Sequence, residues 1–392
     1  MAKQTKVEFG WFIPTNGDGR YLGVKPEREP SPQYFVQVAQ AAERAGYEFA
    51  LIPAGGDCWD GWIVGSWVAA STTRLKPLVA VRPGLLTPGL AARIAATLDQ
   101  MSGGRALINV VTGHYPEDLK ATGDPLYGDH DERYARTKEF LDVLTGVWQT
   151  SAESGGFHYE GRHYRIEGGV CKPSVVQRPY PPLYFGGSSP AGKRVAAEMA
   201  DVYLMWTEPV DWIREQIAEM RRYLDEVEAE KGVKRELRYG IRAQIVVRES
   251  EDEAWEAAWN ILSKADRKLI DEREKRHANT DAVGQKRQME LFAGAKNKDY
   301  LIGPNLWSGL SAVRGGGGVT FVGTPEQVSD RIVEFVEAGI TSFILSGYPH
   351  LEEAEIYTSN QHLSSASTAN GSVIRTTVPF ISALSISIDM AS

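Results

Sequence analysis

Two arginines occupy segments of the sequence where a positive charge would attract an anion. Arg242 lies within GIRAQIVVRES (240–250), an apolar run typical of a covered parallel strand. Desolvating an unpaired guanidinium there would cost on the order of several kcal/mol. Arg314 opens the glycine run at 314–318. Because guanidinium groups pair well with oxyanions, both are candidate ligands of an anionic substrate, and structural salt bridges to nearby acidic residues are the alternative.

The sequence GGSSPAG, which contains Gly187, Ser188 and Ser189, is a candidate phosphate-binding site. It joins a predicted strand directly to a predicted helix, and amides and hydroxyls at the start of a helix bind phosphate well. A simple turn with a serine helix cap is the alternative. Barrel proteins often hold phosphate on their later loops, which favours the binding site.

Further residues with chemical potential lie where predicted strands end. Trp206 could pack on a flat ligand or an alkyl chain, although aromatic residues there are more often core. Tyr348 and His350 could donate or relay protons, or be ordinary hydrogen-bonded residues. Cys58 has no evident base beside it, which argues against a nucleophilic thiolate. No spacing of cysteines and histidines indicates a metal site.

The alternation of strands and helices predicts the framework that positions these residues. Short apolar runs alternate with amphipathic segments, which is typical of parallel strands joined by crossover helices. The eight predicted strands cover residues 7–14, 49–54, 74–84, 105–113, 181–189, 201–206, 237–250 and 342–347. Eight is the number at which such a sheet closes. We therefore predict an α/β protein with a TIM (β/α)8 barrel, and an open doubly wound sheet is the alternative.

We expect one barrel domain over residues 1–356. Residues 151–180 and 265–322 are too long for ordinary connections and are interpreted as insertions over one barrel end. The second insertion has the charged, glycine-containing composition of a mobile lid or of a disordered surface loop. Residues 357–392 form an atypical tail, rich in Ser and Thr, at a place where a last barrel helix is expected.

The composition describes an acidic protein without features for nucleic-acid or membrane binding. The net charge of -8 gives no attraction to nucleic acid. No apolar run approaches the length of about 20 residues that spans a bilayer. The two cysteines, Cys58 and Cys171, cannot form a disulfide scaffold, which fits the reducing cytoplasm.

Six long motifs, spread from about residue 7 to 356, carry a family resemblance. They are WFIPTNGDGRYLG, LDQMSGGRALINVVTG, DHDERY, PYPPLYFGGSSPAG, PNLWSGLSAVRGGGG and FILSGYPHLEEA. Together they resemble the alkanesulfonate monooxygenases, which belong to the bacterial-luciferase-like flavin monooxygenases. The resemblance implies a luciferase-like barrel with insertions. It also implies cleavage of the C–S bond of an alkanesulfonate to sulfite and an aldehyde through a peroxyflavin.

The same resemblance implies the cofactor, the partners and the site residues. Reduced FMN (FMNH2) is the expected co-substrate with O2, an NAD(P)H-dependent flavin reductase is the expected partner, and a homo-oligomer is the expected assembly. The implied active-site residues are Arg242, Arg314, Trp206, Tyr348, Cys58 and, in place of a family histidine, Gln244. The implied residues around the flavin and its phosphate are Asn109, Thr112, His130, Tyr134, Ser188 and Ser189, together with Gly187.

Departures from the family pattern concern the substrate side. Gln244 and Asn16 stand where the family has histidines, Val24-Lys25 replaces a small residue and an acid, and AGGDCWD replaces TGRSCED. A glutamine cannot shuttle a proton, although it can still form hydrogen bonds. We therefore expect retained FMN chemistry with an altered substrate preference.

Three alternative functions remain open from the sequence. TGDPLYGDHDERY also resembles the dimethyl sulfone monooxygenases, which makes a neutral sulfone the leading rival among small organosulfur substrates. A catalytically silent flavin-binding protein is the second alternative, because a fold does not fix a function. A deazaflavin-dependent reductase on the same barrel is the third.

Overall fold

The computed structural model describes residues 6–359, 362–369 and 372–379, except 114 and 279. Parallel strands form a barrel that closes, because β9 pairs with both β8 and β13, and β13 pairs with β1. The barrel strands are β1 (Glu8–Phe12), β2 (Phe49–Ile52), β3 (Lys76–Val81), β4 (Leu107–Val110), β7 (Leu183–Gly186), β8 (Val202–Trp206), β9 (Arg238–Val247) and β13 (Ile340–Ser346). The predicted TIM barrel is confirmed, and the open doubly wound sheet is wrong.

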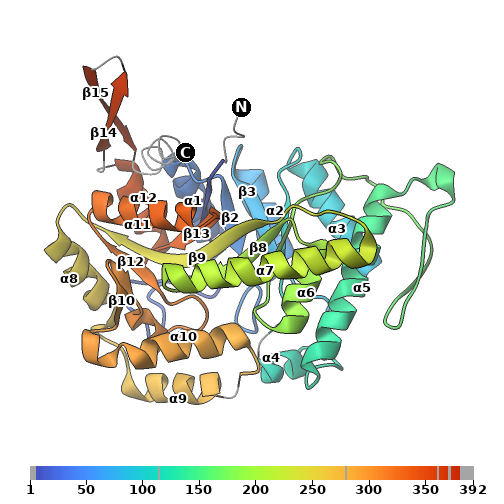
Figure 1. The fold of residues 1–392 in the computed structure, drawn as a ribbon, viewed down its shortest axis with the longest axis horizontal. Helices are drawn as coiled ribbons and strands as arrows, with labels where there is room; N and C mark the ends of the chain where they lie inside the picture. Colours follow the sequence, from blue (N-terminus) through green and yellow to red (C-terminus); the bar gives the residue numbers. More distant parts are fainter. Residues whose placement is uncertain (1–5, 114, 279, 360–361, 370–371, 380–392) are drawn as a thin grey trace.

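Helices cover the outside of the barrel (Figure 1). They are α1 (Pro32–Ala45), α2 (Gly61–Ser71), α3 (Pro88–Met101), α5 (His130–Gln149), α6 (Pro190–Met199), α7 (Val210–Lys231), α8 (Glu251–Leu262), α11 (Pro325–Glu337) and α12 (His350–Ser359). Local sequence sets their ends. The side chain of Ser31 caps α1, and Gly46 ends that helix in the left-handed conformation that glycine adopts without strain.

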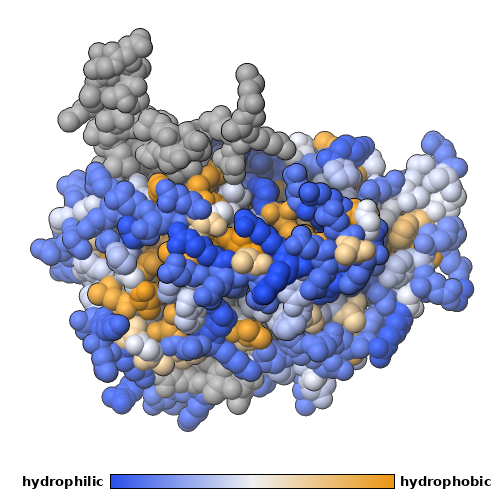
Figure 2. Space-filling model, viewed as in Figure 1, coloured by the Kyte–Doolittle hydropathy of each residue, from blue (hydrophilic) through white to orange (hydrophobic). Residues whose placement is uncertain are grey.

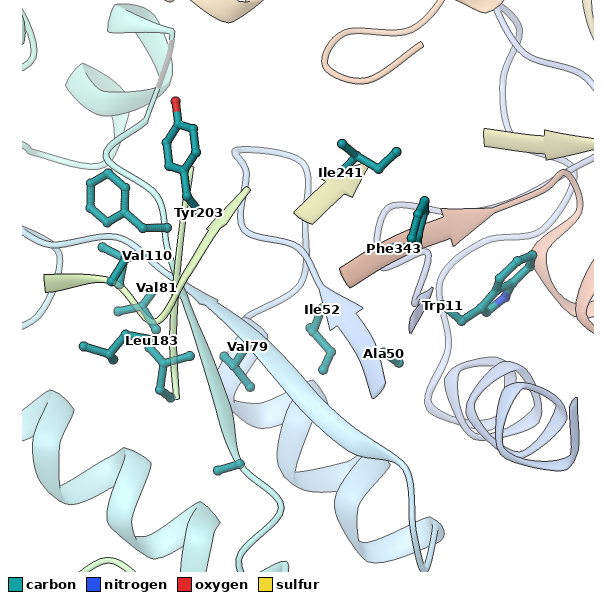
Figure 3. Close-up of a cluster of buried hydrophobic side chains, with 14 of the residues drawn as sticks. Trp11, Ala50, Ile52, Val79, Val81, Val110, Leu183, Tyr203, Ile241 and Phe343 are labelled. Atoms are coloured by element: carbon teal, nitrogen blue, oxygen red, sulfur yellow. The ribbon is translucent and has the colours of Figure 1, made fainter. Parts of the chain in front are cut away.

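The barrel strands alternate between two apolar layers, as the two-residue period of a strand requires. The inner layer fills the barrel with Phe49, Leu51, Leu78, Leu107, Tyr184, Val202 and Ile344. The outer layer packs against the helices and includes Trp11, Ile52, Val79, Val81, Val110, Leu183, Ile241 and Phe343 (Figure 3). Ile241, Ala243 and Ile245 belong to the outer layer, so Arg242 and Gln244 between them face the barrel interior. This alternation explains why Arg242, a charged residue, occurs within an apolar run of the sequence.

The segment 265–322 is built from regular elements rather than from a plain loop. It contains α9 (Arg267–Ala278), α10 (Val283–Gly294), η2 (Lys296–Lys298), β10 (Leu301–Gly303), β11 (Leu306–Trp307), η3 (Gly309–Ala312) and the start of β12 (Thr320–Gly323). β12 pairs in parallel with the second half of β9, and β11 pairs with β12. The ring of Trp307 packs on Trp259 of α8 at 5.0 Å. These contacts anchor the segment to the barrel, and its movement as a lid stays a prediction.

Three further parts of the chain differ from the simple repeat. A short helix α4 (Pro116–Ala121) follows β4, and within 151–180 η1 (Ala152–Ser154) precedes an antiparallel hairpin of β5 (Phe157–Glu160) and β6 (Arg165–Gly169). The last barrel helix, expected within 357–392, lies earlier in the chain: it is α12, which spans His350–Ser359. In the tail, β14 (His362–Ala369) and β15 (Ser372–Pro379) pair with each other.

The surface is mainly hydrophilic on the face drawn in Figure 2, with separate apolar clusters between charged regions. Charged residues on helix exteriors account for this pattern, because the apolar stripe of each helix faces the barrel. In the described part of the chain, no helix is long and apolar enough to cross a membrane.

Candidate active site

A cavity of about 310 Å³ lies at the carboxyl ends of the barrel strands. Its wall combines strand ends, the start of α6 and two pieces of the insertion, 281–284 and 314–317. Every residue that the sequence assigns to the cofactor lines this cavity, namely Asn109, Thr112, His130, Tyr134, Gly187, Ser188 and Ser189. Trp206, Arg242 and Arg314 line it as well. The structure thus brings the predicted cofactor residues and three of the six predicted active-site residues to one cavity.

One end of the cavity is a cluster of hydroxyl groups around the start of α6. The Tyr134 hydroxyl is hydrogen-bonded to Thr112 and Ser189, and burial raises its pKa, so that it stays a neutral donor. Ser189 also caps α6 by accepting a hydrogen bond from Gly192 N at 3.2 Å. A Cβ on Gly187 would lie 2.9 Å from Tyr134 Oη, so only glycine leaves this space open. Neutral donors at the positive end of a helix suit a phosphate group.

The remaining wall of the cavity offers what a flavin ring needs. Asn109 Oδ1 is buried without a hydrogen-bond partner, so it can accept from a ring N–H. Val111, Leu204 and Met205 add apolar surface beside it. With the hydroxyl cluster in the same cavity, the residues present fit flavin mononucleotide.

Arg242 is a buried cation whose partners are all neutral. Its Nη2 donates to Ser346 Oγ at 2.7 Å, its Nη1 donates to the Ala243 carbonyl at 2.5 Å, and its guanidinium lies 4.8 Å from the Phe12 ring centroid. Burial and the charge of Arg314 lower the pKa of Arg242 to about 9, so the group is still protonated at neutral pH. Among the described residues no carboxylate pairs with it. The alternative of a structural salt bridge is therefore wrong for Arg242.

Arg314 is held in the same way at the start of the glycine run. Its Nε donates to Tyr348 Oη at 2.6 Å, and its Nη1 donates to the Gly317 carbonyl at 3.0 Å. It too lacks a carboxylate partner within the described ranges, so the salt-bridge alternative also fails for Arg314. Arg242 and Arg314 are thus two cations with neutral partners, and the charge of Arg314 lowers the pKa of Arg242. Because the two positive charges repel each other, their surroundings favour an anion.

Gln244 lies behind the cavity wall rather than on it. Its Oε1 accepts a hydrogen bond from Ser346 Oγ at 2.6 Å, and its Nε2 donates to the Gly317 carbonyl at 2.9 Å. Ser346 in turn accepts from Arg242, and the Gly317 carbonyl accepts from Arg314. Gln244 therefore joins the supports of both arginines, which is a positioning arrangement and not a direct contact with the cavity.

A second cavity of about 540 Å³ adjoins the first and shares Phe12, Ala54, Arg82 and Arg314 among its lining. Cys58, Tyr348, His350 and Asn16 line this cavity. Burial raises the pKa of the Cys58 thiol, so the side chain is a protonated thiol, as the sequence indicates. No group of three or more potential metal ligands occurs in the parts of the chain described above.

The wall of the second cavity also contains a dyad that sequence reasoning missed. His350 Nδ1 lies 2.9 Å from Asp18 Oδ1, and its backbone N–H donates to Asp18 Oδ2 at 2.7 Å. Although burial alone would raise it, the contacts with His350 hold the pKa of Asp18 below its usual value. These two residues are 332 positions apart, and nothing in the local pattern around either one indicates the pairing.

The insertion residues near the first cavity were also missed by sequence reasoning. Gln285 Oε1 accepts from Gly316 N at 2.9 Å and so holds the glycine run, and Asp281 pairs with Arg133 at 2.5 Å. Both lie in the charged stretch HANTDAVGQKRQ, whose composition indicates a surface loop. Only the tertiary contacts distinguish them from solvent-exposed polar residues.

A buried ion pair fixes α10 to the end of β8. Glu208 is 2% exposed, and it accepts from Arg287 Nε at 2.8 Å and from Gln216 Nε2 at 2.9 Å. We expect Arg287→Met to lower the free energy of unfolding by about 3 kcal/mol, because it leaves a buried carboxylate without its cation. Urea denaturation measures this change.

The matched control for that substitution is the double variant Arg287→Met, Glu208→Gln, which removes both charges. The double variant should recover more than half of the lost free energy of unfolding, because its remaining defect is comparable to the loss of one neutral hydrogen bond. Equal stability of Arg287→Met and the wild-type protein would contradict the anchoring role of the pair.

The fold and this cavity define a protein of the α/β-barrel class with a candidate ligand site at the carboxyl ends of its strands. The sequence profile of the luciferase-like monooxygenase family matches residues 7–342, and the chain belongs to this family.

Solved structures with the same barrel support the fold. A riboflavin lyase crystallised with modified FMN and riboflavin is 21% identical with a TM-score of 0.73, and the match covers 90% of each chain. The EDTA monooxygenase of Chelativorans sp. BNC1 is 18% identical with a TM-score of 0.69, covering 90% of this chain and 92% of that one. A coenzyme F420-dependent tetrahydromethanopterin reductase from Methanopyrus kandleri is 20% identical with a TM-score of 0.63, covering 90% and 98%.

Proposed function

We propose that this protein is a two-component, FMNH2-dependent monooxygenase that cleaves the C–S bond of an alkanesulfonate to sulfite and an aldehyde. The observation that carries the proposal is the pair Arg242 and Arg314, two cations with neutral partners beside the cofactor cavity. A sulfonate brings a full negative charge and three acceptor oxygens. A neutral sulfone would leave both guanidinium groups without a counter-charge, which is costly in a buried site.

The cofactor is held by the residues of the first cavity. Thr112, Tyr134, Ser188 and Ser189 bind the phosphate, and Asn109 accepts a hydrogen bond from the ring. Reduced FMN, delivered in the cytoplasm by an NAD(P)H-dependent flavin reductase, supplies the electrons with which O2 is activated. Trp206 lines the cavity, where its ring would shield the reacting groups from water.

The protein's own contribution to the reaction is binding, orientation and charge. Arg242 and Arg314 bind the sulfonate oxygens. They are held directly by Ser346 and by the Gly317 carbonyl, and Gln244 fixes both of these supports. Tyr348 accepts from Arg314 Nε, so its own O–H can donate to the substrate. The neutral Cys58 thiol is a weak donor at the edge of the second cavity.

Product analysis tests the proposal. The purified protein is supplied with FMNH2 from a flavin reductase, O2 and a panel from methanesulfonate to octanesulfonate, with dimethyl sulfone and reduced F420 as separate arms. We expect sulfite with at least one sulfonate. Turnover of the sulfone alone would assign the rival substrate, turnover of F420 would assign a deazaflavin reductase, and FMN binding without any turnover would identify a silent flavin-binding protein.

The expected homo-oligomer has a candidate interface on α2. Ile63 is 72% exposed and Trp67 54% exposed, and Trp59 just before the helix is 44% exposed. Their spacing of four residues puts them on one face, and the sequence of α2, GWIVGSWVAAS, contains no charge. An exposed apolar stripe of this kind is typical of an association surface. A two-fold axis would lay the stripe against its own copy, which buries apolar groups on both sides.

We expect Trp67→Glu to weaken self-association at least about 100-fold, because it places a charge in the centre of the apolar contact. Light scattering after gel filtration measures the mass of the assembly. Val233→Glu, at another exposed apolar residue, should leave the assembly unchanged. A wild-type protein that is monomeric at micromolar concentration would refute this interface.

A further inference from the structure

Arg82 is a third arginine that contacts both cavities. It follows β3 directly, at the carboxyl end of the strand, and its side chain is 7% exposed. It lines the first cavity together with Arg242 and Arg314, and it also lines the second cavity. Its position at the junction lets one side chain reach a ligand that extends from one cavity into the other.

The hydrogen-bonding groups of Arg82 are almost unused. Its Nη2 makes one long hydrogen bond, 3.4 Å to the Ala54 carbonyl, and its Nε is buried without a partner. The Nε of Arg136 is also unpaired, so Arg82 is distinguished by a guanidinium that makes a single long hydrogen bond while lining a cavity, which points to a ligand. Because Ala54 also lines both cavities, the hydrogen bond to its carbonyl does not direct the Arg82 side chain away from them.

Structural arginines elsewhere in this protein behave differently. Arg136 forms a two-pronged ion pair with Asp124, with both N–O distances at 2.7 Å. Arg105 donates to four backbone carbonyl oxygens. Arg82 has neither a carboxylate within ion-pairing distance among the described residues nor a set of carbonyl acceptors. A purely structural role therefore does not account for its burial.

The charged neighbours of Arg82 are acidic, but none of them forms a salt bridge with it among the described residues. Burial lowers the pKa of Arg82, and electrostatic interactions with Asp118, Cys58 and Asp124 oppose that change. Asp57 and Asp118 both line the second cavity, whereas the neighbouring Cys58 thiol is neutral. An anionic head group is therefore best placed at the junction, toward Arg314 and away from these carboxylates.

We propose that Arg82 is a specificity-determining residue that binds the anionic head group of the substrate and selects sulfonates over neutral sulfur compounds. The inference rests on the proposed function, and it adds a third cation to the two that carry that proposal. Arg82 lines the same cavity as Arg242 and Arg314, so it can add a charge-assisted contact to a sulfonate, whereas a sulfone has no charge.

Two substitutions at Arg82 and one control test this inference in the full-length protein. Arg82→Met removes the charge at similar length, and Arg82→Lys keeps the charge without the forked donors. Arg44→Met removes an exposed arginine that lines neither cavity. Sulfite release gives KM and kcat for octanesulfonate, and calorimetry gives the Kd for octanesulfonate and, separately, for FMN. Thermal unfolding reports any loss of the fold.

For Arg82→Met we expect KM and Kd for octanesulfonate to rise about 10- to 100-fold, because one charge-assisted contact is lost. The kcat should change less than about threefold, and Arg82→Lys should recover part of the loss. The Kd for FMN and the behaviour of Arg44→Met should match the wild-type protein. Unchanged sulfonate binding in Arg82→Met, or an equal loss of FMN binding or of thermal stability, would overturn the inference.

The calorimetric measurement separates this inference from the proposed function. If the wild-type protein releases sulfite and Arg82→Met does so with the same KM, the inference fails while the proposed function stands. If the wild-type protein binds octanesulfonate without turning it over, the proposed function fails. In that case a weaker Kd in Arg82→Met still supports an anion-binding role for Arg82, and an unchanged Kd overturns it.

Discussion

Arg242→Met is expected to lower kcat/KM for an alkanesulfonate by about 10³-fold while the fold remains intact. The loss follows from removing a preorganised cation that acts in a buried site, where charge stabilisation is strongest. Stability should change by only about 1 kcal/mol, because the substitution removes a desolvated charge with neutral partners and not one half of an ion pair. Sulfite release and urea denaturation on the same preparation measure both quantities.

Arg242→Lys provides the matched comparison, since it keeps the charge but not the planar fork. It should retain more activity than Arg242→Met and still fall about tenfold or more below the wild-type protein. Activity of Arg242→Met within tenfold of the wild-type value would show that the anion binds elsewhere. Unfolding of that variant would show that the arginine is structural.

Ser188→Asp is expected to weaken FMN binding at least about 100-fold, because it places a negative charge at the start of α6 where the phosphate should lie. Ser188→Ala removes one hydrogen bond and should weaken FMN binding by about fivefold. Quenching of flavin fluorescence during titration with the protein measures both dissociation constants.

Ser151→Asp controls for the added negative charge, because Ser151 is exposed and precedes the hairpin of β5 and β6. It should bind FMN like the wild-type protein. If Ser188→Asp also binds FMN with the wild-type affinity, the phosphate does not occupy the hydroxyl cluster, and the orientation of the cofactor in the cavity would have to be reversed.

The barrel could be predicted from the sequence because its signals are local. Each barrel strand is a short apolar run, and the helices between them begin and end at residues such as Ser31 and Gly46. Arg242 stood out for the same reason, since a charge within an apolar run has to face something polar. The place of GGSSPAG in the cavity wall could be predicted because the motif combines small residues and hydroxyls at a helix start, and phosphate binding there stays a prediction.

The parts that could not be predicted depend on contacts between distant residues. β12 pairs with the second half of β9 across more than 70 positions, and no run of residues in either strand specifies that register. The segment 265–322 is rich in charge, so its helices lack the apolar periodicity that identifies α1 or α11. The strand alternation places Gln244 on the inner side of the barrel, like a residue that lines the cavity. Only its hydrogen bond to the Gly317 carbonyl shows that it supports the cavity wall instead.

The most direct test of the central claim, that the arginine site admits a sulfonate to the flavin cavity, is the stoichiometry of sulfite released to FMNH2 oxidised. It is measured with a flavin reductase that keeps free FMNH2 low, with and without the preferred alkanesulfonate. The account predicts close to one sulfite per FMNH2 in the wild-type protein and none in Arg242→Met. Oxidation of FMNH2 that yields hydrogen peroxide without sulfite, whatever sulfonate is present, would contradict it.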